Sequence, residues 1–218
     1  MFYAHKGILC KKSPFFNACL NSNVFAEGKE NTVRFEEDKP DVIDLFLAWV
    51  YGGSQTLSCC QDTDVISLVG TYVFADRLCI EELKNSIVST VIGYLNKGES
   101  GVPVEGLVIL SHAGLERSML RGYLHWKLGR DITLFGFEKA VGGTEGLRSY
   151  IQAGGEATLD LFKETISPTK FLLAVSDVEA ERYTKWMKFC CQWHEHKDTE
   201  TCIKTSKFGE VQADHGYY

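Results

Sequence analysis

The chain has 218 residues, 44% of them hydrophobic, and its 23 basic and 29 acidic residues give a formal net charge of −6. This hydrophobic content is enough for a sizeable core and excludes a chain that is disordered throughout. Binding of nucleic acid is not expected, because phosphate recognition needs a clustered positive surface and the chain has no run of five or six basic residues.

The cellular compartment follows from targeting signals and cysteines. Residues 1–9 lack the apolar core and cleavage site of a signal peptide, and no apolar stretch reaches the roughly 18 residues that suggest a membrane span. We therefore expect a cytoplasmic or nuclear protein without a membrane partner. Its eight cysteines are expected to be reduced thiols or metal ligands, with Cys10, Cys19 and Cys79 in the core.

Two short helices are predicted at the start of the chain. The first covers residues 5–12 and ends before Pro14, because proline disfavours a helical residue ahead of it. Ser13 is then the N-cap of a second helix that reaches about Leu20, with Pro14 at its first position. The surface that this pair is expected to bury consists of Ile8, Leu9, Phe15, Phe16, Cys19 and Leu20.

A strand and three longer helices are predicted next. Residues 31–36 alternate in hydrophobicity, which predicts a half-buried strand with Val33 and Phe35 on one face. A helix opened by Asp38 and Pro40 should end at Gly52-Gly53 and bury one apolar side. The apolar positions of the first of these helices are Ile43, Phe46, Leu47 and Val50. The second helix is expected to begin after a cap at Asp62 or Thr63 and to carry Val65, Leu68, Val69, Tyr72 and Val73. The third carries Ile80, Leu83, Ile87 and Val91.

The second half is predicted to be mainly helical. Residues 97–103 are rich in small and helix-breaking types and are expected to be a linker. Helices are expected over residues 115–128 and 156–166. A further amphipathic helix should follow the capping-box pair Ser176 and Glu179, and the polar tail after Cys202 is expected to be flexible.

Three stretches of the first half resemble BTB/POZ domains. The first is FYAHKGILCKKSPFF at residues 2–16, which is similar to the family's first helical hairpin. The second is EDKP at residues 37–40, followed by a helix ending in WVYGG at residues 49–53. The third is residues 64–95, which resemble the family's last two helices. Near the C-terminus, CQWHEH at residues 191–196 is similar to a stretch in BTB proteins of fungi.

The resemblance implies an α+β fold with helical hairpins around a small β-sheet. Family members carry a pair of strands before the hairpin motif, and these N-terminal strands are missing here. We expect a BTB/POZ domain over residues 1–96, a linker over 97–103, a helical region over 104–202 and a flexible tail over 203–218. The helical region either packs on the domain or forms a separate lobe.

The resemblance also assigns roles to individual residues. His5 is implied to be structural, and no nucleophile motif accompanies it, so we expect no enzyme. Adaptors of the cullin-3 ubiquitin ligase carry a hydrophobic-x-Glu motif, which Phe25 and Glu27 match. Phe25 either anchors a partner in this way or folds back onto the helical hairpin.

The one metal-like group of residues lies near the C-terminus. Cys190, His194, His196 and Cys202 supply four ligands of the kinds that zinc binds, although their spacing fits no standard zinc finger. The alternative is that these are ordinary helix-end side chains, in which case the protein has no cofactor. The sequence therefore predicts a non-enzymatic interaction module that forms dimers or oligomers. It serves either as an adaptor for a cullin-3 ubiquitin ligase or as a self-associating transcriptional or scaffolding regulator.

Overall fold

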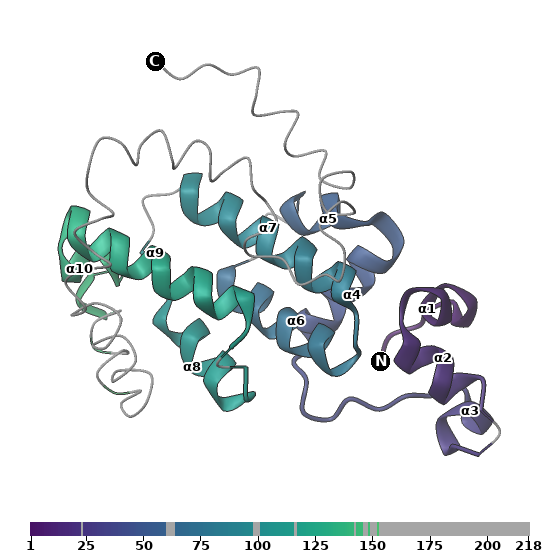
Figure 1. Ribbon diagram of the computed structural model, residues 1–218. Coiled ribbons are helices and arrows are strands. Elements are labelled where there is room, and N and C mark those ends of the chain that lie inside the picture. The colour runs from purple at the N-terminus through teal and green to yellow at the C-terminus, as the bar shows by residue number, and fades with distance from the viewer. Residues whose placement is uncertain are drawn as a thin grey trace. The chain divides into compact units, whose positions relative to one another are not determined.

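The computed structural model describes residues 1–22, 24–59, 64–97, 101–115, 117–141, 143–145, 148 and 152. The chain divides into two compact units, residues 1–94 and 95–218, and each is described by itself. The helices are α1 (Lys6–Lys12), α2 (Pro14–Leu20), α3 (Ala26–Glu30), α4 (Pro40–Gly52), α5 (Ser54–Cys59), α6 (Val65–Arg77), α7 (Glu81–Lys97), α8 (Val104–His112), α9 (Met119–Phe135) and α10 (Phe137–Ala140) (Figure 1). None of these helices combines the length and the apolar character that a membrane span requires.

The junction of α1 and α2 confirms the local prediction. Ser13 is the N-cap of α2, and its Oγ accepts a hydrogen bond from the Phe16 N–H at 3.5 Å. The same hydroxyl donates to the carbonyl oxygen of Leu78 at 3.1 Å. One buried serine thus begins α2 and also ties the hairpin to the end of α6.

The core of the first unit is built around aromatic rings. Phe46 stacks on Phe16 with centroids 5.8 Å apart and meets Phe74 edge-on at 5.3 Å. Trp49 of α4 and Tyr72 of α6 are also fully buried. Offset and edge-on ring pairs of this kind stabilise a core beyond the area that they bury.

The burial predictions for α1, α2 and α4 are partly wrong. Leu9, Phe16, Cys19 and Leu20 are buried as predicted, but Ile8 is 38% exposed and Phe15 is only half-buried. In α4 the buried side consists of Val42, Leu45, Phe46, Trp49 and Val50. Ile43 and Leu47, which the periodicity places in the core, are half-buried.

Several predicted helix ends need correction. Lys39, not Asp38, is the N-cap of α4. Asp64 caps α6, its Oδ1 accepting from the Ser67 N–H at 2.6 Å, whereas the sequence prediction favoured Asp62 or Thr63, which lie outside the described residues. Gly53 ends α4 as predicted, with a positive φ of 75°. The short helix α5 was not anticipated.

The predicted strand over residues 31–36 is not formed, and the described residues contain no β-sheet. Residues 32–35 are irregular, yet Val33 and Phe35 are half-buried while Thr32, Arg34 and Glu36 are exposed. The alternation of burial that the sequence predicted is therefore present, but no described segment pairs with it to make a ladder.

The second unit contains α8, α9 and α10. Ser118 begins α9, its Oγ accepting from the Arg121 N–H at 3.3 Å. Helix α9 starts four residues later than predicted and continues to Phe135, and α8 was not predicted. Lys127 and Asp131, one turn apart on α9, form a buried ion pair. The predicted helices over 156–166 and after Ser176 lie outside the described residues.

Candidate interaction surface

Phe25 lies at the start of a one-turn helix and not in an open loop. It is the N-cap of α3, in an extended conformation with φ −83° and ψ 148°. Its side chain is 52% exposed, and the neighbouring Val24 is 81% exposed. Two adjacent apolar side chains are thus presented to solvent at one helix end, where they are available to a partner.

Glu27 occupies the first turn of α3, where a negative charge interacts favourably with the helix dipole. It is half-buried, so it does not extend freely into solvent as Phe25 does. Burial, and next the charge of Glu27, raise the pKa of the Cys19 thiol on α2. The carboxylate therefore lies near the end of α2, and the two residues of the motif differ in their exposure.

Close packing fixes α3 on the end of α2. A Cβ added to Gly28 would lie 2.0 Å from the Ser22 carbonyl oxygen and 3.0 Å from that of Cys19. These contacts involve backbone atoms, which cannot rotate away as the end of a side chain can. Gly28 is therefore a positioning residue for Phe25. Its role was not predicted from the sequence, where Gly28 is simply the glycine that follows the Phe25-x-Glu27 motif.

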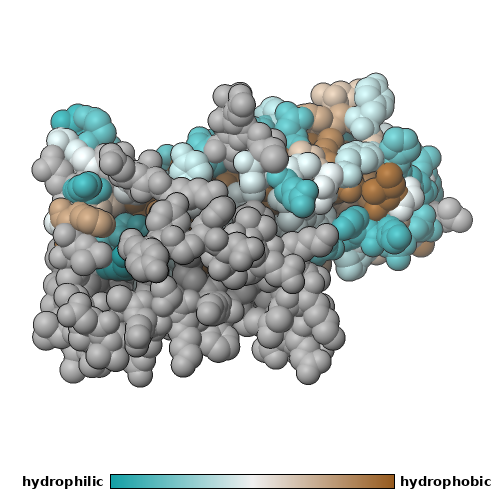
Figure 2. All heavy atoms as spheres, turned by 90° about the horizontal axis from the view of Figure 1, so that it is seen from above, coloured by the Kyte–Doolittle hydropathy of each residue, from teal (hydrophilic) through white to brown (hydrophobic). Residues whose placement is uncertain are grey.

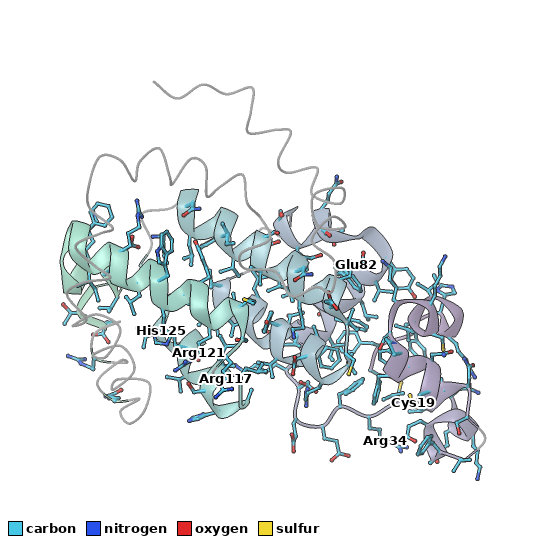
Figure 3. The ribbon with its side chains drawn as sticks, viewed as in Figure 1. Cys19, Arg34, Glu82, Arg117, Arg121 and His125 are labelled. Atoms are coloured by element: carbon cyan, nitrogen blue, oxygen red, sulfur yellow. The ribbon has the colours of Figure 1, made fainter. Side chains whose placement is uncertain are left out.

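Polar contacts hold the other end of α3. Asn31 ends the helix in the left-handed conformation, with φ 48°. Its side-chain oxygen accepts from Lys6 Nζ at 3.2 Å, and the next residue, Thr32, donates its N–H to the Glu27 carbonyl at 3.3 Å. The hairpin and α3 thus support each other, with Cys19 and Arg34 marking this region in Figure 3.

His5 connects the start of α1 to the end of α4. Its backbone N–H donates to the Tyr51 hydroxyl at 2.8 Å, and its Nδ1 lies 2.9 Å from the same oxygen. The two rings meet edge-on with centroids 5.8 Å apart. These contacts agree with the structural role that the resemblance implied for His5.

A second feature of the first unit is a groove of about 720 Å³ that the sequence did not predict. It is lined by the N-terminal residues 1–4, by residues 31–36 and by side chains of α1, α2, α4 and α6. Val33, Phe35, Ile43 and Leu47 are half-buried around it. The sequence predicts an apolar helix side with Ile43 and Leu47 and one face of a half-buried strand with Val33 and Phe35, but not that these two faces line a groove.

Apolar groups also reach the surface of this unit elsewhere. Figure 2 shows separate hydrophobic areas, in brown, among polar side chains of the first unit. Met1 and Tyr3, which line the groove, are 101% and 87% exposed. The apolar surface near the groove is thus continued by the N-terminal side chains.

The predicted metal ligands Cys190, His194, His196 and Cys202 lie outside the described residues, as does the stretch 191–196. Within the described part of the chain, no three His, Cys, Asp or Glu side chains form a group that could hold a metal ion. The prediction for the core cysteines is partly wrong. Cys19 is buried, Cys10 is half-buried, and Cys79 is exposed in the turn after α6.

Comparison with known proteins identifies the first unit. A model of the BTB/POZ domain family matches residues 1–92, which include the hairpin of α1 and α2, the α3 surface and helices α4 to α6. No curated protein matches the chain. Residues 1–92 therefore carry a BTB/POZ domain.

Proposed function

We propose that this protein is an adaptor that associates with itself through its BTB/POZ domain and recruits a cullin-3 ubiquitin-ligase scaffold through Phe25 and Glu27. The BTB/POZ domain is in general a non-enzymatic domain for protein–protein interaction and self-association. The recruitment of cullin-3 is the specific part of the proposal, and it places the protein in the cytosol or nucleus.

The observation that supports the proposal is the exposure of Phe25 at a fixed position. A side chain that is 52% exposed on a helix held by backbone contacts is already arranged for binding. Aromatic side chains that fill a partner's pocket commonly dominate the binding energy of an interface. Val24 beside it adds exposed apolar area, and Glu27 supplies a carboxylate in the first turn of α3.

The remaining half of the chain has a separate role in this proposal. An adaptor must hold a substrate as well as the ligase, and residues 104–218 are the part of the chain left for that task. The zinc site proposed at Cys190, His194, His196 and Cys202 would stabilise this region and supply no catalysis. Metal analysis of protein purified without chelator tests it, and less than one zinc per ten chains excludes it.

The experiment is titration calorimetry of the full chain with the N-terminal region of cullin-3. We expect Phe25→Ala to weaken binding roughly 30-fold or more, the equivalent of about 2 kcal/mol. Phe135→Ala is the matched control, because Phe135 is a 54% exposed aromatic residue on α9. Loss of binding in both variants, or in neither, would contradict a specific role for Phe25.

Light scattering on the chain alone distinguishes the alternative function. A stable dimer or larger oligomer that shows no heat with cullin-3 would replace the adaptor by a self-associating transcriptional or scaffolding regulator. A monomer with no cullin-3 binding would contradict both functions, since each requires self-association.

A further inference from the structure

The segment that precedes α3 is held by a serine side chain. The Oγ of Ser22 accepts a hydrogen bond from the Val24 N–H at 3.1 Å. This is a local turn in which a serine hydroxyl bonds to the backbone two residues further along the chain. The carbonyl oxygen of the same serine lies against Gly28 of α3. Ser22 therefore contacts the chain on both sides of Phe25 and fixes the backbone that carries it.

Val24 is the more exposed member of the apolar pair that it forms with Phe25. Single exposed apolar side chains are common on protein surfaces and need no explanation. These two are consecutive, however, and the backbone on both sides of them is held. A valine loses little side-chain freedom on binding, because its branched Cβ already restricts χ1. The pair is therefore suited to binding, and Val24 contributes little to the core.

The charged side chains of α3 leave apolar contact as the main means of recognition. Glu27 is half-buried, and Glu30 forms an ion pair with Arg34 at 3.3 Å. Lys29 is exposed and pairs with no acidic side chain in the described part of the chain. A single exposed cation contributes little binding energy in water. The start of α3 therefore favours a partner surface that is apolar and not one that is strongly acidic.

We propose that Val24 is a second anchor for the cullin-3 scaffold, and that the Ser22 hydroxyl is the positioning group that holds Val24 next to Phe25. This inference rests on the proposed function, because the partner is the same scaffold. The partner must then offer an apolar surface that accepts an aliphatic side chain and an aromatic side chain that follow each other along the chain. Two adjacent anchors also give selectivity, since a surface that fits only an aromatic ring obtains no binding energy from Val24.

Titration calorimetry of the full chain with the N-terminal region of cullin-3 tests the second anchor. Val24→Thr keeps the branched shape but replaces a methyl group by a hydroxyl, so it should weaken binding roughly fivefold or more. Lys29→Ala is the matched control on the same helix and should change the affinity by less than about twofold. An unchanged affinity in Val24→Thr, or a larger loss in Lys29→Ala than in Val24→Thr, would overturn the proposal.

Two variants of Ser22 test the positioning role. Ser22→Ala removes the acceptor of the Val24 N–H, so the segment must be ordered during binding and the affinity should fall about threefold to tenfold. Ser22→Asn keeps an acceptor that reaches the N–H two residues further on, and it should restore most of the affinity. Circular dichroism should show both variants to be folded. Equal weakening by alanine and asparagine would overturn the positioning role of the hydroxyl.

Failure of the proposed function gives a different result from failure of this inference. If the parent chain shows no heat with cullin-3, the adaptor function and the second anchor are both overturned. If the parent binds and Phe25→Ala weakens the complex while Val24→Thr does not, the second anchor alone is overturned and Phe25 acts without it. Weaker binding in both variants, with Lys29→Ala close to the parent, is the result expected for two anchors.

Discussion

Gly28 of α3 lies against the carbonyl oxygen of Ser22, so closely that a Cβ on Gly28 would be 2.0 Å from it. We predict that Gly28→Ala lowers the free energy of unfolding by about 1–3 kcal/mol, because backbone on both sides must shift to relieve the overlap. Urea denaturation followed by circular dichroism measures this change. The same variant should bind cullin-3 more weakly, since Phe25 precedes the displaced helix by a single residue.

Gly7→Ala is the control for this prediction. Gly7 lies in α1, and an added Cβ there would meet nothing within 4 Å. Alanine in an open helical position should stabilise the protein by about 0.5–1 kcal/mol. If the two alanine variants changed stability in the same direction, the close contact of Gly28 would not be the cause.

Cys79 occupies a position that favours glycine. It follows the C-cap of α6 with φ 55°, and its N–H bonds to Asp76 while that of Ile80 bonds to Ala75. This is the Schellman arrangement, in which the left-handed residue is usually glycine. Cys79→Gly should therefore raise the free energy of unfolding by about 1 kcal/mol.

Cys79→Ala separates this backbone effect from the loss of the thiol. Alanine still carries a Cβ, so it should leave the stability close to that of the parent in the same urea titration. Equal stabilisation by alanine and glycine would instead assign the effect to removal of the exposed sulfur.

The Tyr51 hydroxyl joins α4 to the first residue before α1. Tyr51→Phe should lower the free energy of unfolding by about 1 kcal/mol. The variant removes the hydroxyl that accepts the hydrogen bond from the His5 N–H and that lies next to His5 Nδ1. Tyr3→Phe is the matched control, since the hydroxyl of the exposed Tyr3 contacts the sulfur of Met1. Thermal unfolding of both variants checks the prediction. A loss of similar size in Tyr3→Phe would mean that the His5 contact contributes little.

Helix ends that depend on neighbouring residues were predictable from the sequence, whereas contacts between residues far apart along the chain were not. Ser13 and Pro14 define the start of α2 by local chemistry, so their roles were predictable. The exposure of Ile43 and Leu47 depends on which segment covers α4, and a helical periodicity cannot supply that information. Gly28 could not be recognised as a contact residue before α3 was placed against α2. Phe25 was found through the motif that it shares with a family, although its helix was not predicted.

The Cys19 thiol gives the protein a predicted sensitivity to alkaline pH. Burial, and next the nearby Glu27 carboxylate, raise the pKa of this thiol above its ordinary value. As the pH rises through the ordinary thiol pKa, near 9.0, the unfolded chain loses the proton before the folded chain does. The free energy of unfolding should therefore fall between pH 8 and pH 10.

Cys19→Ser removes this titration and should show a smaller loss over the same interval. Glu27→Gln removes the second cause alone, so its loss should lie between those of the parent and Cys19→Ser. Urea titrations of the three proteins at pH 8 and pH 10 test this order. The other thiols and tyrosines are common to all three and cancel in the comparison. If Cys19→Ser and the parent lost the same free energy of unfolding between pH 8 and pH 10, other groups would determine that loss. Cys19 would then ionise as readily in the folded chain as in the unfolded chain.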